Sequence, residues 1–294
     1  MKEPAAPPVP PLAVLSLGVV AMSTGAIFAR MAEAEPLAIS FWRCAIAALA
    51  LAPLGAPRTP RELASLGRRD LLILGLSGLF LALHFATWIQ SLEHTTVASS
   101  VLLVNTGPLW TLLLAPLLTH DRPGRGARLG ALLGFAGGAV VAGGDLALSG
   151  EALLGDGLAL AGGLFASLYL VAGRRLRDRM SFATYAALCY GLAALVLLAL
   201  AILAGAPLTG FEGETWLWLA LCGLVPQLIG HSSANWALRW ATSTLVAVSL
   251  LGEPIASTLL ALVVLGEVPE AGFLAGAPLL LGGILVTARA ERRA

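Results

Sequence analysis

The chain carries little charge for its length. Charged residues make up 12% of its 294 residues, whereas an ordinary soluble domain contains about 25%. The 18 basic and 17 acidic side chains leave a formal net charge of +1, so no overall field would attract nucleic acid. A soluble globular domain, a disordered chain and a free nucleic-acid binder are therefore excluded.

Cysteine and histidine are scarce as well, with 3 and 4 residues. Cys44, Cys189 and Cys222 each lie within an apolar run, where no disulfide framework could be organised. The histidines lack the clustered ligands of a metal site, and the sequence contains no phosphate-binding loop for ATP. We therefore predict no cofactor, no metal ion and no catalytic residue, and we exclude primary pumping unless a partner supplies it.

Apolar residues dominate the rest of the sequence. They make up 58% of it and give a mean hydropathy of +0.87. A helix needs only about 20 mostly apolar residues to cross the hydrocarbon core of a bilayer. Ten such runs predict an all-α membrane protein with ten transmembrane helices. The runs lie at about 12–30, 36–54, 70–91, 95–119, 127–146, 152–173, 182–205, 215–238, 243–266 and 271–288.

The basic residues predict the orientation, because Lys and Arg near helix ends are retained in the cytoplasm. With the N-terminus inside, 16 of the 18 basic residues fall in cytoplasmic segments, and only Arg30 and Arg43 do not. Arginine in place of lysine, with abundant Ala, Gly and Leu, suggests a bacterial genome of high GC content. We therefore predict a multi-pass protein of the bacterial inner membrane with both termini in the cytoplasm.

An internal repeat appears when the sequence is shifted by 146 residues, which places Pro108 on Pro254 and Asp121 on Glu267. Each half then carries five helices, and because five is odd the halves have opposite orientations. We predict a Pro-rich cytoplasmic tail at 1–11, five-helix repeats at 12–148 and 149–288, and a cytoplasmic tail at 289–294. A cleaved signal peptide is the competing interpretation of the N-terminus, but its removal would destroy this symmetry.

Two runs are interrupted at corresponding places, by Asn-Thr-Gly-Pro at 105–108 and by Gly-Glu-Pro at 252–254. Proline removes a backbone donor and frees a carbonyl. Inverted repeats with interrupted helices are typical of transporters, whose site lies near the middle of the bilayer. A pair of merely kinked, packed helices is the alternative.

The ten helices, the repeat, the Ala-Ser-Ser at 98–100 leading to Pro108, and the segment from 252–254 to Leu-Gly-Glu at 265–267 resemble the drug/metabolite transporter superfamily. The most similar group is the EamA-type exporters, which include bacterial amino-acid exporters. The resemblance covers nearly the whole chain. It implies a ten-helix inverted-repeat fold and export of small metabolites by alternating access, without specifying the substrate.

Histidines and tryptophans inside the runs are candidates for the site. His84 and Trp88 are four residues apart and share a helix face, as do His231 and Asn235. Aromatic walls with a few polar groups suit a small solute with an apolar side chain, such as an aromatic or large neutral amino acid. Ordinary helix packing is the alternative. The predicted substrate-binding residues are His84, Trp88, Asn105, Pro108, Trp110, Tyr169, His231, Asn235, Glu253 and Pro254.

Charges inside a span are costly and need a reason. Glu253 is predicted either to receive a substrate ammonium or to couple proton entry to export, and a fixed hydrogen bond at the kink is the alternative. Arg43 has three interpretations: it meets a substrate carboxylate, extends its side chain outward, or pairs with Glu267. Glycines at 126, 130, 134 and 138, with Gly272 and Gly276, indicate close helix packing within a monomer or in a homodimer.

We therefore predict a membrane transporter that exports small metabolites, with the lipid bilayer, the solute and a coupled proton as its partners. A proton-coupled multidrug or metabolite antiporter is the alternative, although residues 11–29 lack the acid expected there. An intramembrane serine protease is a remote alternative, because Gly-Leu-Ser-Gly at 75–78 matches a GxSG pattern and His231 lies at a similar depth. The repeat argues against any enzyme.

The topology can be tested with single cysteines on a Cys-free background. A cysteine at position 58 should resist a membrane-impermeant thiol reagent in intact cells and react once the membrane is opened, because this segment is predicted to be cytoplasmic. A cysteine at position 33, on the predicted outer side, is the control. Labelling of position 58 in intact cells would overturn the topology.

Overall fold

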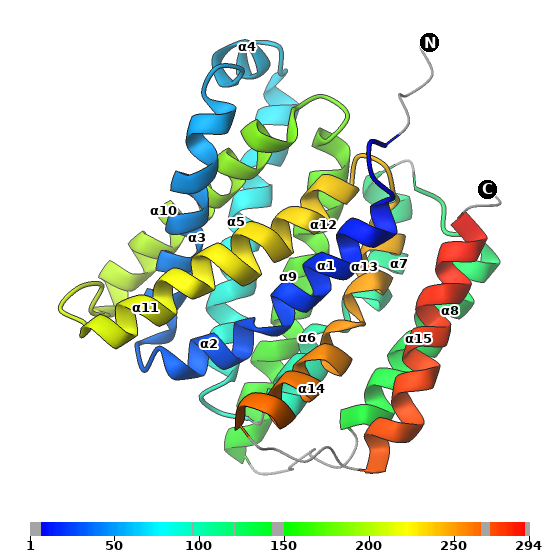
Figure 1. Cartoon of the computed structure of the whole chain (residues 1–294). Coiled ribbons are helices and arrows are strands. Elements are labelled where there is room, and N and C mark those ends of the chain that lie inside the picture. The colour runs from blue at the N-terminus through cyan, green and yellow to red at the C-terminus, as the bar shows by residue number, and fades with distance from the viewer. Residues whose placement is uncertain (1–6, 96, 120, 143–149, 266–270, 292–294) are drawn as a thin grey trace.

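The computed structural model describes residues 7–95, 97–119, 121–142, 150–265 and 271–291, and this part of the chain is helical, with no strand (Figure 1). The first repeat contains α1 (Pro11–Ser23), α2 (Gly25–Met31), α3 (Pro36–Gly55), α4 (Thr59–Ala64), α5 (Arg68–Ser91), α6 (Val97–Val104), α7 (Gly107–Leu118) and α8 (Arg125–Ala142). The second contains α9 (Gly150–Leu176), α10 (Phe182–Ala204), α11 (Gly213–Cys222), η1 (Gly223–His231), α12 (Ser232–Ala237), α13 (Ser243–Leu250), α14 (Glu253–Leu265) and α15 (Ala271–Glu291).

These elements form the expected membrane spans. Among the described residues, eight helical segments are long and apolar enough to cross a bilayer, several of them built from two or three consecutive elements. The shorter apolar stretch Leu274–Ala290 and the 18-residue α8 lie where the two remaining spans are expected. The all-α fold with two inverted five-helix repeats is confirmed, and the run expected at 127–146 is helical to Ala142, its last four residues lying outside the described part.

Both expected helix interruptions are present. The α6/α7 segment breaks at Asn105 and Thr106, and the α13/α14 segment breaks at Leu251 and Gly252. Proline occupies the second position of α7 and of α14. At the start of a helix the N–H groups have no acceptor within the helix, so the N–H that proline lacks costs no hydrogen bond there. Two further irregularities have no counterpart in the sequence prediction: the α1/α2 break at Thr24 and the π-helix η1.

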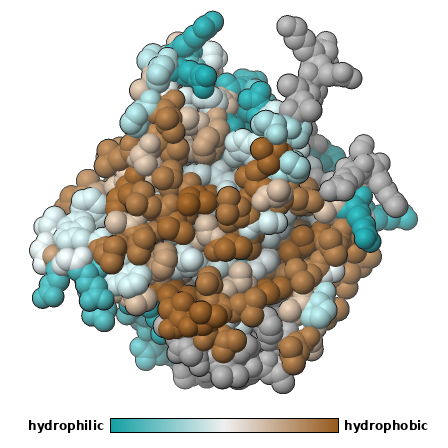
Figure 2. Space-filling view, in the orientation of Figure 1, coloured by the Kyte–Doolittle hydropathy of each residue, from teal (hydrophilic) through white to brown (hydrophobic). Residues whose placement is uncertain are grey.

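The surface of the bundle is apolar around its middle. Figure 2 shows hydrophobic residues over much of the face in view, with hydrophilic residues gathered toward its ends. Large side chains on several spans are exposed, among them Leu203 at 84% and Val263 at 81%. In water such exposure would be costly, but hydrocarbon is the solvent that this surface fits.

Glycines let α8 and α15 approach each other closely, and the two helices run side by side in Figure 1. A Cβ built on Gly126 would lie 2.7 Å from the Cβ of Ala290, and one on Gly137 would lie 2.7 Å from the carbonyl oxygen of Gly276. The predicted glycine packing therefore lies within one chain. Gly272 is in α15, but its side-chain surroundings, like those of residue 138, are outside the description.

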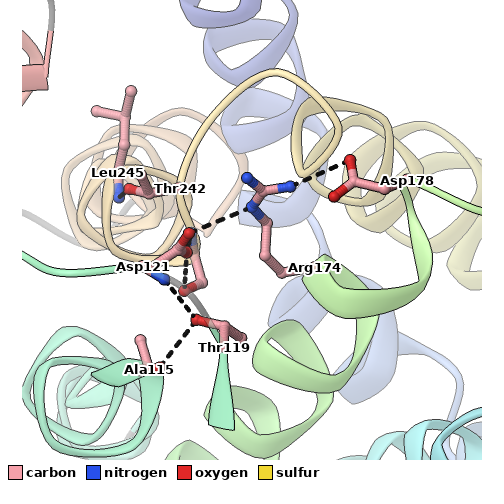
Figure 3. A network of polar contacts seen from close by, with 8 residues as sticks. Ala115, Thr119, Asp121, Arg174, Asp178, Thr242 and Leu245 are labelled. Carbon is pink, nitrogen blue, oxygen red and sulfur yellow. Dashed lines mark hydrogen bonds and ion pairs between the residues drawn. The ribbon is translucent and has the colours of Figure 1, made fainter. Parts of the chain in front are cut away.

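A polar network ties three elements together at one end of the bundle (Figure 3). The carboxylate of Asp121 accepts hydrogen bonds from the backbone N–H and the hydroxyl of Ser243, both at 2.9 Å. Its other oxygen lies 3.5 Å from Nε of Arg174 on α9. An acid at the start of α13 favours that helix because the N-terminal N–H groups are unpaired there.

The α8–α15 contact gives a stability prediction for Gly130→Ala. The new Cβ would clash with Oγ1 of Thr287 and would lie 2.6 Å from the carbonyl oxygen of Gly283. A backbone atom cannot move aside as easily as the end of a flexible side chain can. We expect a loss of about 1–3 kcal/mol, more than the gain of about 1 kcal/mol in helix propensity. The midpoint of thermal unfolding in detergent measures it.

Gly191→Ala is the matched control, because a Cβ built at Gly191 in α10 would have no described atom within 4 Å apart from those of its chain neighbours and its own helix backbone. This variant should unfold at the wild-type temperature or slightly above it. Equal midpoints for the two variants would show that the α8–α15 contact does not need glycine at 130.

Candidate functional site

A cavity lies where the interrupted helices of the two repeats meet. It holds about 540 Å³ of unfilled space, the open part at its mouth included. Its walls come from spans of both repeats, which is the arrangement expected of a site between inverted repeats. The lining residues are Met22, Arg43, His84, Trp88, Val104, Asn105, Gly107, Pro108, Ala166, Ser167, Leu170, His231, Ala247, Leu250 and Glu253.

Six of the ten predicted site residues line this cavity. They are His84, Trp88, Asn105, Pro108, His231 and Glu253. The structure thus brings together both interruptions and the two helix faces that carry histidine.

The face of α5 forms an aromatic wall. The rings of His84 and Trp88 are stacked, with centroids 5.9 Å apart and an interplanar angle of 4°. Nδ1 of His84 lies 3.0 Å from the carbonyl oxygen of Gly162, so this nitrogen carries a proton and the ring is held in place. The ring of His231, from the other repeat, has its centroid 5.9 Å from that of His84. The two histidines therefore face each other across the repeat boundary.

The two interruptions are joined by a polar contact. Nδ2 of Asn105 donates to Oε2 of Glu253 at 3.4 Å and to the carbonyl oxygen of Val101 at 2.8 Å. The backbone carbonyl of Glu253 accepts from the hydroxyl of Ser23 at 3.3 Å. Within the described part of the chain, the carboxylate of Glu253 thus has one long hydrogen bond, and it lines the cavity where a ligand could reach it.

Four predicted residues are not among those that line the cavity. The ring centroid of Tyr169 lies 6.4 Å from that of His231. Trp110 donates from Nε1 to the hydroxyl of Thr106 at 3.2 Å. Pro254 follows Glu253 and shapes the start of α14.

Asn235 is the fourth. Its Nδ2 donates to the hydroxyl of Tyr190 at 2.9 Å, and its backbone carbonyl accepts from Nε of Arg177 at 3.0 Å. Arg177 follows α9 at the end of that span, and burial lowers the pKa of Arg177 to about 10, so it stays charged at neutral pH. Asn235 belongs to this packing contact in the structure.

Arg43 is a cavity residue that the sequence prediction left undecided. The residue is 1% exposed, so outward extension of its side chain is wrong, and Glu267 lies outside the described residues. Its Nε donates to Oε1 of Gln227 at 2.9 Å, and its guanidinium carbon lies 4.3 Å from the ring centroid of Phe85. The sequence feature that indicates a function for Arg43 is the position of this basic residue well inside an apolar run.

Two further polar residues, Gln227 and Ser167, were not selected by the sequence prediction. Gln227 lies in η1, and π-helical turns are frequent at functional sites because they redirect side chains. The hydroxyl of Ser167 lies 3.0 Å from the carbonyl oxygen of Gly107, beside the α6/α7 break. A search for polar residues that face a helix break would have identified Ser167 as a candidate.

The protease alternative has no geometric support in the described residues. The hydroxyl of Ser77 lies 2.6 Å from that of Tyr185, and no hydrogen bond joins Ser77 to His231 in this part of the chain. The described residues also contain no group of three His, Cys, Asp or Glu side chains that could hold a metal ion.

Comparison with known proteins gives a consistent match. The profile of the EamA-like transporter family matches residues 10–143 and again residues 153–289. A solved crystal structure superposes with a TM-score of 0.78 at 24% identity, covering 96% of this chain and 98% of the other. At that identity the superposition speaks for the fold alone.

Two curated relatives are similar over most of the chain. The aromatic amino acid exporter YddG of Ancylobacter novellus is 31% identical over 223 residues, which cover 74% of this chain and 76% of the exporter. An uncharacterized transporter of Archaeoglobus fulgidus is 24% identical over 277 residues, covering 94% of this chain and 96% of its own.

Proposed function

Because the chain belongs to the EamA-like transporter family and is a membrane transporter, we propose that it exports amino acids with aromatic or large neutral side chains. The observation that carries this proposal is the cavity between the interrupted helices, in which an aromatic wall and a few polar groups converge. A mostly apolar site with few oriented polar groups suits a small solute of that kind. The similarity to an aromatic amino acid exporter supports the same substrate class.

Alternating access follows from the repeat. The five-helix repeats at 12–148 and 149–288 rock against each other, so that the cavity between them opens to one side and then to the other. The chain lies in the bacterial inner membrane with its tails at 1–11 and 289–294 in the cytoplasm, in keeping with the side on which its arginines gather. The solute's own gradient supplies the driving force, unless a proton gradient contributes.

Efflux from proteoliposomes tests the proposal. Vesicles loaded with radiolabelled phenylalanine, leucine or methionine should lose label faster than protein-free vesicles, and each solute is measured with and without a pH gradient. Glutamate and glucose serve as solutes of other classes. Amino-acid efflux no faster than from empty vesicles would reject the function.

The aromatic wall gives a second test. His84→Ala and Trp88→Ala should each lower phenylalanine efflux by about tenfold, because loss of a stacked aromatic contact and its buried area is worth on the order of 1–2 kcal/mol. Trp110→Ala is the matched control, since Trp110 does not line the cavity, and it should retain most of the efflux. Equal effects of all three substitutions would mean that the wall is ordinary packing.

A proton-coupled antiporter is the second candidate, favoured by the acid of Glu253 in the cavity wall. If Glu253 carries the coupled proton, Glu253→Gln removes the dependence of efflux on the pH gradient while exchange of labelled for unlabelled solute continues. Efflux is measured at several internal and external pH values. An unchanged rate and pH dependence would remove Glu253 from the mechanism.

A further inference from the structure

Arg43 is a buried charge that makes no ion pair with the described residues. The residue is 1% exposed, and no Asp or Glu oxygen lies within 4.0 Å of its guanidinium among the described residues. Taking a charge out of water without a counter-ion is strongly unfavourable, and the aromatic faces of Phe85 and Trp88 offset only part of that cost. A ligand that brings a negative charge would complete the site.

The guanidinium is fixed in position and partly free to bind. Nε is occupied by Gln227, while NH1 is buried and has no hydrogen-bond partner among the described residues. NH1 also lies 3.2 Å from where a Cβ on Gly25 would be, so glycine at 25 keeps the space beside it open. A planar guanidinium held this way suits a carboxylate.

Arg43 is matched by a single acid across the repeat boundary. Of the 15 described residues that line the cavity, Arg43 is the only Lys or Arg and Glu253 the only Asp or Glu. Arg43 comes from α3 in the first repeat and Glu253 from α14 in the second, and no ion pair joins them in the described structure. One positive and one negative group that line the same cavity without direct contact suit a solute carrying one charge of each sign.

We propose that Arg43 binds the carboxylate of the exported amino acid and that Glu253 receives its ammonium, with Gln227 as the positioning residue for Arg43. This assignment rests on the proposed function and narrows it to zwitterionic α-amino acids. Solutes that lack either charged group leave one buried charge unpaired and are rejected, because an unpaired buried charge costs far more than a missing apolar contact. A phosphorylated solute would need more cationic groups than this cavity offers.

The first test of the assignment is a competition experiment with the wild-type protein. Proteoliposomes are loaded with labelled phenylalanine and one unlabelled competitor: phenylalanine, phenylalaninamide, phenethylamine or 3-phenylpropionate. The amide and the amine lack the carboxylate, and 3-phenylpropionate lacks the ammonium. Unlabelled phenylalanine should slow the efflux of label at a concentration at least tenfold lower than any of the three analogues.

Variants then assign the carboxylate to Arg43. Gln227→Glu is the most informative, because it gives Arg43 a fixed counter-ion in place of its present acceptor. A purely structural Arg43 would tolerate that change, whereas an Arg43 that binds substrate should lose at least tenfold in phenylalanine efflux at an unchanged unfolding temperature. Arg43→Gln should abolish the preference for phenylalanine over phenylalaninamide, and Arg43→Lys should retain part of it.

Arg177→Gln is the matched control, since Arg177 is an equally buried arginine that lies outside the cavity lining. It should keep the wild-type preference even if its expression falls. Phenylalanine efflux in which phenylalaninamide competes as well as phenylalanine itself overturns the assignment and leaves the proposed function standing, as does wild-type efflux by Gln227→Glu. Absence of amino-acid efflux by the wild type overturns both.

Discussion

Hydrocarbon offers no hydrogen-bonding partner to a peptide group, so each break in a spanning helix has to be covered by the protein itself. The structure meets this constraint largely within its own backbone. At the α6/α7 break the N–H of Thr106 donates to the carbonyl of Leu103 at 3.2 Å, and at the α13/α14 break the N–H of Gly252 donates to the carbonyl of Ser249 at 3.1 Å. The proline that follows each break has no N–H to satisfy. Residues at both breaks line the cavity between the repeats.

The tight packing of α8 against α15 and the cavity between the repeats are formed by different types of residue. Between α8 and α15, glycine brings backbone against backbone, and the built Cβ of Gly137 would lie 2.7 Å from a carbonyl oxygen of the facing helix. Around the cavity, the rings of His84 and Trp88 stack on each other, and the ring of His231 lies against His84 across the repeat boundary. The bundle therefore combines a helix pair packed through glycine with a cavity that has an aromatic wall.

Much of the fold was predictable because its signals are local. Hydropathy marks a span wherever about 20 apolar residues follow one another, and proline beside polar residues marks a break. Both helix interruptions and the shared face of His84 and Trp88 follow from spacing along one helix. The π-helix η1 was not predictable in this way, because its turn is wider than the 3.6-residue period that sequence patterns assume.

The sequence by itself determined the membrane class, the two repeats and six of the cavity residues. Tertiary structure decided the surroundings of Arg43, since its partner Gln227 is 184 residues away and only the packing of α3 against η1 brings them together. It likewise placed the glycines of α8 against α15 of the same chain and turned Asn235 toward Tyr190. Periodicity tells which side chains share a face, but which faces meet depends on how the helices pack.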